Sequence, residues 1–278
     1  MAKNLKKSDN KWDKMAEWWD KEVGEKGIWH QQHGIDPVVF KTLGDIKGKA
    51  ILEIGCGNGY FARLLAKKGA KVTSIDLSKK LIALAVKKEK LKPFGIKYLL
   101  RNASSLHGIK SKSFDIVIAN MCLMDIADAQ GATKEAFRVL KEDGRFLLSI
   151  THPVFNIVGD EWTVLKAEDG KTYFARAVYK YLSPVKEKFK LWASGIQTDM
   201  YHRSIQTYFK YLLSSGFFID EFMEIPTKKK VTKATKQDGD MRMRRSKYMT
   251  LAEKKMKEFA GKEIPLFLII GALKIKRK

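Results

Sequence analysis

The chain has 278 residues, 45% of them hydrophobic, and is long enough to bury a substantial core within a single α/β domain. Its two cysteines have no metal-type spacing, which excludes a disulfide scaffold and favours free thiols in a reducing cytosol. The N-terminus has no apolar signal segment, and the longest apolar run, residues 264–273, is about half a bilayer span. We therefore expect a cytoplasmic protein without a membrane anchor.

The first elements in chain order are expected to be helices. Aromatic residues recur at helical spacing within residues 10–24. Asp36 followed by Pro37 predicts the start of a second helix, with Asp36 as its cap and Pro37 in its first turn. We expect residues 1–44 to form a lid over a binding crevice. Packing of the first helix on the sheet is the simpler alternative for its tryptophans, which are Trp12, Trp18 and Trp19.

Strands and helices alternate after residue 50, and such alternation predicts a parallel sheet with right-handed crossovers. Residues 155–200 break the alternation, and their turn residues indicate a hairpin insertion. A helix at 203–215 and two further strands at 216–225 and 265–275 complete the pattern. The earlier strands are expected at 50–54, 71–76, 97–101, 114–119 and 144–150.

The segment after the first of these strands is the most informative. Gly55, Gly57 and Gly59 supply a turn without side chains that would obstruct a ligand. The second strand ends in Asp76, about 20 residues past the first glycine, and Ser78 is placed to cap the next helix. A carboxylate at this position can accept hydrogen bonds from the two ribose hydroxyls of a nucleoside. The sequence therefore predicts a nucleoside site at the carboxyl edge of the sheet.

The glycine spacing bears on which nucleoside binds. A dinucleotide fold requires G-x-G-x-x-G, so that the pyrophosphate sits on a helix N-terminus. Counting from Gly57 gives Gly57-x-Gly59-x-x-Ala62, a weak match that leaves a nicotinamide-dependent oxidoreductase as a remote alternative. Glu53 favours a different ligand, because a carboxylate aimed into the crevice repels a pyrophosphate and attracts an ammonium and a sulfonium. S-adenosylmethionine carries both of these cations.

On these motifs the chain resembles the class I S-adenosylmethionine-dependent methyltransferases, specifically the small-molecule branch related to the ubiquinone-biosynthesis enzymes. The resemblance runs over roughly residues 36–152 and resumes at 201–225 and 264–275. It implies an α/β fold with a doubly wound, mostly parallel seven-stranded sheet of order 3-2-1-4-5-7-6, the last strand antiparallel, and helices on both faces. In the fifth motif Asp143-Gly144 replaces the usual Gly-Gly turn. The matching motifs are Glu53 to Gly59, Asp76, Ser113 to Met121 and Arg138 to Leu148.

The resemblance also implies S-adenosyl-L-methionine as the cofactor and a set of residues that contact it. The family's third motif usually has an aspartate where this chain has Asn102. The Asn102 carbonyl can still accept from the adenine amine, and the Ala103 N–H can meet a nitrogen of the adenine ring. The implied cofactor-binding residues are Glu53, Gly55, Cys56, Gly57, Asn58, Gly59, Asp76, Leu77, Asn102, Ala103, Ser104, Asn120 and Met121.

Methyl transfer from a sulfonium is an in-line displacement, so the protein must mainly exclude water and position the acceptor. His152 leaves the fifth strand beside the expected reaction site and is our candidate base or acceptor-positioning group, with a packed or capping histidine as the alternative. Arg203 would hold a carboxylate or phosphate of the acceptor, or brace the start of its helix. The histidines lack further metal ligands nearby, so we expect no metal. The candidate substrate-binding residues are Trp19, His30, His33, His152, Tyr201, His202 and Arg203.

One methyltransferase domain is expected to span residues 1–278. The helical lid is followed by a cofactor-binding core at 45–152 and by the hairpin insertion at 153–200, which would cap the substrate. The remainder, 201–278, completes the sheet and carries a basic insertion at 227–262.

The formal charge of +23 keeps a nucleic-acid partner open. Residues 227–278 hold 17 Lys and Arg against 5 Asp and Glu, whereas elsewhere the lysines are scattered along helix faces. An RNA or tRNA methyltransferase that uses this segment is therefore the main alternative, although the Asn-Pro-Pro-aromatic and Pro-Cys signatures of such enzymes are missing. A non-catalytic binding protein is a third interpretation. We favour methyl transfer to a small-molecule acceptor, with the acceptor, the methylated atom and the oligomeric state left open.

Overall fold

The computed structural model of the chain describes residues 11–155, 161–166, 168–169, 172–178, 181–190, 196–226 and 265–275. The basic insertion expected at 227–262 and residues 1–10 of the expected lid lie outside the described residues. The helices are α1 (Lys11–Val23), the π-helical turn η1 (Gln31–Ile35), α2 (Asp36–Leu43), α3 (Tyr60–Lys67), α4 (Lys79–Leu91), the 3-10 turn η2 (Leu123–Asp125), α5 (Ala129–Val139) and α6 (Ile205–Ser215). The strands are β1 (Ala50–Ile54), β2 (Lys71–Asp76), β3 (Lys97–Leu100), β4 (Phe114–Asn120), β5 (Leu140–Thr151), β6 (Glu161–Lys166), β7 (Thr172–Ala177), β8 (Val185–Lys190), β9 (Gln197–His202), β10 (Phe218–Pro226) and β11 (Pro265–Leu273). None of the described helices is long and apolar enough to cross a membrane.

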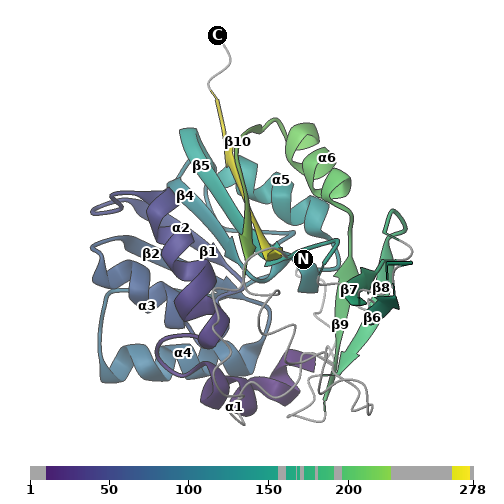
Figure 1. Cartoon of the computed structure of the whole chain (residues 1–278). Helices are drawn as coiled ribbons and strands as arrows, with labels where there is room; N and C mark the ends of the chain where they lie inside the picture. The colour runs from purple at the N-terminus through teal and green to yellow at the C-terminus, as the bar shows by residue number, and fades with distance from the viewer. Residues whose placement is uncertain are drawn as a thin grey trace.

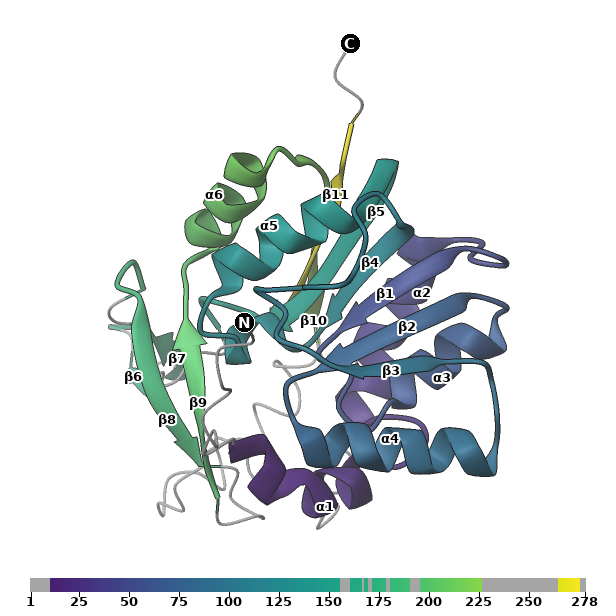
Figure 2. The ribbon, with the colours of Figure 1, turned by 180° about the vertical axis from the view of Figure 1, so that it is seen from behind.

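Seven of the strands form one sheet in the order β10-β11-β5-β4-β1-β2-β3 (Figures 1 and 2). β1 pairs in parallel with β2 and β4, and the parallel pairing continues to β3 and β5. β11 is antiparallel to both β5 and β10. Counted over the strands of this sheet alone, the order is 3-2-1-4-5-7-6 with the last strand antiparallel. The predicted fold is therefore confirmed.

Helices cover both faces of the sheet, with α2 and α3 on one face and α5 and α6 on the other (Figures 1 and 2). Alternate residues of β4 enter the two cores. Ile116 and Ile118 pack in the cluster that contains Phe61 of α3, whereas Val117 and Ala119 pack in the cluster on the α5 side. A strand buried on both faces has a near-continuous apolar sequence, as the central strands here have. The apolar clusters on the two faces of the sheet thus fix the pairing register of the strands, and with it the positions of the strand ends that carry the site.

The carboxyl ends of β1, β4 and β5 point toward the side of the molecule where α1 and two small hairpins lie (Figure 2). β6 and β7 form the antiparallel hairpin that the sequence predicts within residues 155–200. A second hairpin, β8 with β9, was not predicted, and its pairing runs from Val185 opposite His202 to Lys190 opposite Gln197. Ligands of open α/β sheets bind beyond the carboxyl ends of the strands. The hairpins and α1 therefore lie on the side where a ligand is expected.

Helix caps were predicted at two positions, Ser78 and Asp36, and the structure tests both. The predicted cap at Ser78 is confirmed, because its Oγ accepts a hydrogen bond from the Leu81 N–H at 3.2 Å. The predicted cap at Asp36 is wrong. The chain enters α2 directly from the π-helical turn η1, so the Asp36 N–H is already bonded to the Gln31 carbonyl and Ile35 has helical torsions. The Asp36 carboxylate is directed to the end of β4 instead.

The Asp143-Gly144 pair lies within β5 and not in a turn before it. β5 begins at Leu140, ahead of the predicted start at residue 144. Asp143 has a positive φ of 59° and lies where the pairing of β5 with β4 shifts register. Its N–H donates to the Lys274 carbonyl at 2.8 Å, so the neighbouring C-terminal strand stabilises the irregularity. The Asp143-Gly144 dipeptide forms a β-bulge and not a turn, because the residues of β5 on either side of it remain paired with β4.

Candidate cofactor and acceptor site

Three glycines shape the loop between β1 and α3, and all have positive φ: 68° at Gly55, 55° at Gly57 and 77° at Gly59. A Cβ added at Gly57 would lie 3.3 Å from the indole nitrogen of Trp19, and one added at Gly55 would lie 2.6 Å from Cβ of Cys122. Backbone conformation and close neighbours thus both disfavour side chains here. The loop presents main-chain groups at the carboxyl edge of the sheet.

Asp76, at the end of β2, is bonded to this loop. One carboxylate oxygen accepts from the Gly57 N–H at 2.9 Å, and the other accepts from the Ser78 N–H at 2.8 Å. Burial raises the pKa of Asp76, and these backbone bonds oppose the rise. Each carboxylate oxygen can accept more than one hydrogen bond, so the group retains capacity for ribose hydroxyls. Leu77, next along the chain, is exposed at the rim.

Glu53 is buried beneath the loop and not exposed to a crevice. It is 2% exposed, and one of its carboxylate oxygens accepts from the Ser74 hydroxyl at 2.8 Å. Burial raises the pKa of Glu53 to about 8, and the nearby charges of Asp76 and Asp36 add to the rise. Glu53 was predicted to be an ionised carboxylate, but with this raised pKa the Glu53 side chain holds a proton at neutral pH.

The turn after β3 begins beside Asp76, because Leu100 is the partner of Asp76 in the β2–β3 pairing. The Asn102 side-chain oxygen accepts from both the N–H and the hydroxyl of Ser104, at 3.0 and 2.9 Å. Ala103 between them is buried. Both acceptor positions of the Asn102 carbonyl therefore serve this turn. The predicted contact with an adenine amine requires one of these bonds to open.

Asn120, the last residue of β4, belongs to a buried hydrogen-bond network. Its Oδ1 accepts from the Ser149 hydroxyl at 2.6 Å, and its Nδ2 donates to Asp36 Oδ1 at 3.1 Å. The Tyr60 hydroxyl lies 3.3 Å from Nδ2 and 3.4 Å from Asp36 Oδ1. The next residue, Met121, has a positive φ of 57° and donates its N–H to Ser149 at 3.0 Å. The network joins α2, α3, β4 and β5 at the edge that carries the site.

Helix α1 is packed on the core and also borders the glycine loop. Asp13 accepts from the Ser78 hydroxyl at 2.5 Å, which ties α1 to the start of α4. Asn58 of the loop donates its amide to Asp20 of α1 at 2.8 Å. The Trp19 indole lies against the loop. Both interpretations of the tryptophan helix, packing and proximity to the ligand loop, are therefore compatible with its location.

His152 uses both ring nitrogens within the protein. It is 1% exposed, and Nδ1 accepts from the N–H groups of Val154 and Phe155 at 3.2 and 3.3 Å. Nδ1 is then the unprotonated nitrogen, so the Nε2–H donates to the Glu224 carboxylate at 2.9 Å. Burial lowers the pKa of His152, and Glu224 opposes this effect. The side chain is a neutral imidazole that holds the turn after β5.

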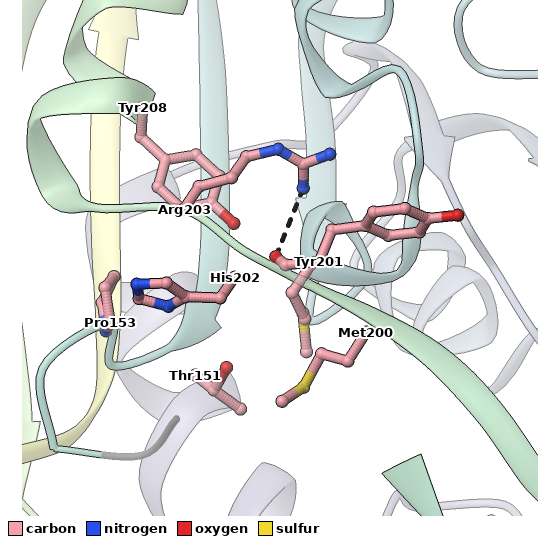
Figure 3. Close-up of a pocket in the computed structure, with 8 residues that line it drawn as sticks. Thr151, Pro153, Met200, Tyr201, His202, Arg203 and Tyr208 are labelled. Carbon is pink, nitrogen blue, oxygen red and sulfur yellow. Dashed lines mark hydrogen bonds between the residues drawn. The ribbon is translucent and has the colours of Figure 1, made fainter. Parts of the chain in front are cut away.

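A small pocket lies between the end of β5 and the strand–helix junction β9–α6 (Figure 3). The His202 ring at its wall donates from Nε2 to the Tyr181 carbonyl at 2.8 Å. The pocket thus brings together the region of His152 and the predicted segment at 201–203, which are far apart in the sequence. Its lining residues are Met124, Thr151, Pro153, Met200, Tyr201, His202, Arg203 and Tyr208.

The Arg203 guanidinium is directed to backbone carbonyls. It donates to Ile126 and Ala127 at 2.7 and 2.8 Å and to Leu123 at 3.2 Å. Its plane also lies over the Tyr201 ring, with the central carbon 5.3 Å from the ring centroid. These bonds hold the η2 turn and the residues after it, and not the start of α6 that Arg203 was predicted to brace.

The two histidines near the start of η1 differ in their surroundings. The exposed His33 stacks on Trp29 with ring centroids 4.8 Å apart, and its Nδ1 lies 3.0 Å from the Trp29 carbonyl. The His30 ring lies 5.4 Å from Phe267 of β11. Of the two, His30 is therefore the one that lies against the sheet.

The two cysteines are free and buried, and burial raises the pKa of both thiols. They are inert small side chains under the loop. Within the described part of the chain, no group of three His, Cys, Asp or Glu side chains is placed to hold a metal ion.

Two acids near the site were missed in the sequence. Asp36 precedes a proline and was taken for a helix cap. Asp125 ends η2, next to the pocket residue Met124, and no motif marks it. Burial raises the pKa of Asp36 to about 7 and that of Asp125 to about 8, the latter with a contribution from the Asp76 charge. Among the described residues, no hydrogen bond or ion pair engages the Asp125 carboxylate.

A glycine loop bonded to an acid at the next strand end, on a sheet of this order, defines the class I methyltransferase fold. Residues 52–148 match the family model described as a methyltransferase domain. Residues 52–148 thus form a class I S-adenosylmethionine-dependent methyltransferase domain, with distant homology to ubiquinone-biosynthesis O-methyltransferases. The resemblance inferred from the motifs is thereby confirmed, as is S-adenosylmethionine as the donor of the family.

Three similar proteins illustrate the relationship. The ubiquinone biosynthesis O-methyltransferase of Pseudomonas fluorescens is 28% identical over 153 residues, 52% of this chain and 64% of that protein, so the chain spans less than two thirds of its length. An S-adenosylmethionine-dependent methyltransferase from Mesorhizobium loti aligns with a TM-score of 0.62 at 24% identity, over 85% of this chain and 96% of that one. A Haemonchus contortus N-methyltransferase in complex with phosphomonomethylethanolamine and S-adenosylhomocysteine aligns with a TM-score of 0.59 at 19% identity. The alignment covers 95% of this chain and 58% of that one. The two structures show that the fold is shared.

Proposed function

We propose that this chain transfers a methyl group from S-adenosylmethionine to a small-molecule acceptor. The observation that carries the proposal is the pocket between β5 and the β9–α6 junction, at the same edge of the sheet as the glycine loop. Small molecules bind in concave sites, whereas nucleic acids need broad basic surfaces. Two of the similar proteins named above support the same class of acceptor: an O-methyltransferase of ubiquinone biosynthesis, and an N-methyltransferase in complex with phosphomonomethylethanolamine.

The residues around the loop suit a sulfonium donor. Asp36 and Asp76 lie close enough to Glu53 for their charges to raise its pKa. A pyrophosphate would add negative charge to this cluster, whereas a cation reduces the repulsion. The bound donor supplies a methyl group activated by a positively charged sulfur. The residues we assign to the donor are Gly55 to Gly59 for its methionine portion, Asp76 for the ribose, Leu77 and Asn102 to Ser104 for the adenine, and Asn120 with Met121 beside the reacting end.

Helix α1 and the β8–β9 hairpin would enclose the acceptor. An ion pair between Lys11 of α1 and Asp199 of β9 links the two elements. Excluding water and orienting the acceptor in line with the carbon–sulfur bond can contribute about 7–11 kcal/mol to lowering the barrier. The acceptor-side residues are Trp19, His30, His33, Tyr201, His202 and Arg203.

We assign His152 a positioning role. The neutral ring holds the N–H groups of Val154 and Phe155 and donates to Glu224, so it shapes the wall that leaves β5. The Pro153 that follows is part of the pocket lining. A histidine used in this way acts on the acceptor through the turn that it fixes.

Asp125 is our candidate for the proton acceptor. Asp125 follows the pocket residue Met124 in the chain, and the η2 turn that carries it is held by Arg203. A bound donor would supply the methyl group activated by its sulfonium, and Asp125 would take up the proton that the acceptor loses. Because burial raises the pKa of Asp125 to about 8, the ionised form that accepts a proton is the minor form at neutral pH, and the rate of transfer should rise with pH through this range.

The function is tested with donor that carries a deuterated methyl group. Purified protein is incubated with this donor and, in separate arms, with the small-molecule fraction and the RNA fraction of a cell extract. We expect the label to appear in one small molecule with the native protein and to be absent with Gly57→Asp, which fills the loop with a charged side chain. Asp125→Asn should retain donor binding and lose most of the transfer.

Label in the RNA fraction alone would contradict the small-molecule proposal and promote the RNA alternative. That alternative depends on residues 227–278, most of which lie outside the described residues. Donor binding without label in either arm would indicate a binding protein that does not catalyse transfer.

A further inference from the structure

Asp36 is a buried acid with one unused oxygen. The residue is 4% exposed, and its Oδ1 receives the hydrogen bonds from Asn120 and Tyr60. Its Oδ2 has no hydrogen-bond partner among the described residues. A buried carboxylate oxygen without a donor is costly, because the group has lost water and gained nothing in its place. Such an atom in a native fold calls for a donor that the described part of the chain does not supply.

The position of Asp36 points to the methyl donor. Asn120, to which Asp36 is bonded, ends β4, and the preceding Ala119 pairs with Ile54, the last residue of β1. The glycine loop starts immediately after Ile54. Asp36 is therefore fixed at the junction of the β4 end and the loop. The chain reaches it through the π-helical turn η1, and π-turns of this kind occur frequently at functional sites.

The charges around Asp36 leave a place for a cation. Burial is the main cause that raises its pKa to about 7, and the Asp36 charge in turn raises the pKa of Glu53. Arg63 lowers the pKa of Glu53, but this guanidinium is already ion-paired with Glu25 at 2.9 Å and bonded to the Asn58 carbonyl at 2.8 Å. A ligand cation with N–H donors would stabilise the Asp36 carboxylate directly.

We propose that Asp36 is a specificity-determining residue for the methyl donor, whose α-ammonium group donates a hydrogen bond to Asp36 Oδ2. The sulfonium has no N–H, and the adenine amine is neutral. The α-ammonium is the part of the donor that combines positive charge with N–H donors. The inference rests on S-adenosylmethionine as the donor and assigns the recognition of its amino group to a residue of α2.

The test compares two ligands on the same protein samples by calorimetry. The first is S-adenosylhomocysteine, and the second is its analogue in which hydrogen replaces the α-amino group. Asp36→Asn keeps the size of the side chain and removes the charge. We expect it to weaken S-adenosylhomocysteine by about 10- to 100-fold and to leave the affinity for the analogue nearly unchanged. Asp45→Asn, at an exposed acid before β1, should change neither affinity and serves as the control.

The ratio of the two affinities within one sample does not depend on the fraction of the protein that is folded, so a less stable Asp36→Asn sample is still informative. Unchanged S-adenosylhomocysteine affinity in Asp36→Asn, or equal loss for both ligands, would overturn the assignment. A native protein that binds neither ligand would instead refute S-adenosylmethionine as the donor, and with it the role of Asp36.

Discussion

Asp76 and Gly57 are joined by a hydrogen bond of 2.9 Å between the Gly57 N–H and Asp76 Oδ2, across 19 residues of sequence. The acid assigned to the ribose and the loop assigned to the methionine portion are thus one structural unit. A change at either residue will alter the other half of the donor site.

Replacing Asp76 with Asn should weaken S-adenosylmethionine binding by at least about tenfold. The amide has one accepting oxygen in place of two, so it cannot accept hydrogen bonds from the loop and from the ribose together. Calorimetric titration measures the affinity. Asp115→Asn is a matched control, since Asp115 also accepts from a backbone N–H, that of Ala50 at 2.7 Å, but at the opposite end of the sheet. Equal donor affinity in Asp76→Asn and the native protein would contradict the assignment.

Gly57→Ala and Gly48→Ala form a second matched pair. Both glycines have positive φ, 55° and 74°, but a Cβ at Gly48 meets nothing within 4 Å whereas one at Gly57 meets Trp19. Each substitution should lower the free energy of unfolding by about 1–2 kcal/mol through backbone strain. Only Gly57→Ala should also lower the affinity for S-adenosylmethionine. Chemical unfolding and calorimetry separate the two effects, and a similar loss of affinity in Gly48→Ala would show that strain alone is responsible.

Arg203→Lys should loosen the η2 turn. A lysine cannot bond three carbonyls in the plane that the guanidinium spans, so we expect a loss of about 1.5–3 kcal/mol in the free energy of unfolding with little change in donor affinity. Arg101→Lys is the control, because this exposed side chain bonds only the neighbouring Leu100 carbonyl within the described structure. A large loss of acceptor methylation without any loss of stability would favour direct contact of Arg203 with the acceptor.

Asp36 also predicts a pH dependence of stability. The folded protein holds the Asp36 proton up to a pKa of about 7, whereas the ordinary value is 3.8. The folded state therefore binds more protons between these values, and its stability falls as the pH rises through this window. Relative to Asp36→Asn, the native protein without ligand should lose about 2–3 kcal/mol between about pH 5 and about pH 8. Comparison with the variant cancels the opposite contribution of His152, whose pKa is lowered. Parallel stability curves would contradict the prediction.

Local patterns sufficed for most of the fold and for the positions of the glycine loop and of Asp76. The loop at Gly55 to Gly59 and the acid at Asp76 follow from the positions of glycines and from strand ends, which are read within a short window of sequence. The cap at Ser78 is local in the same sense. These features could be predicted because the residues that determine them are neighbours in the chain.

Other features depend on residues that meet only in the folded protein. His152 is neutral because its partners are Glu224, 72 residues away, and two N–H groups of a turn that no sequence signal fixes. Asp36 was taken for a cap because its true partner, Asn120, lies 84 residues further on. The β8–β9 hairpin has no regular alternation of polar and apolar residues, so its pairing was not predicted. In each case tertiary packing overrode the local preference.

The π-helical turn η1 has a consequence for how the chain tolerates change. A turn of this kind holds an extra residue relative to an α-helix. Deleting one residue from 31–35 would let α2 continue as a regular helix and would rotate position 36 by about 100° around its axis. The number of residues between α1 and α2, and not the identity of any one of them, therefore determines whether an acid at position 36 reaches the end of β4.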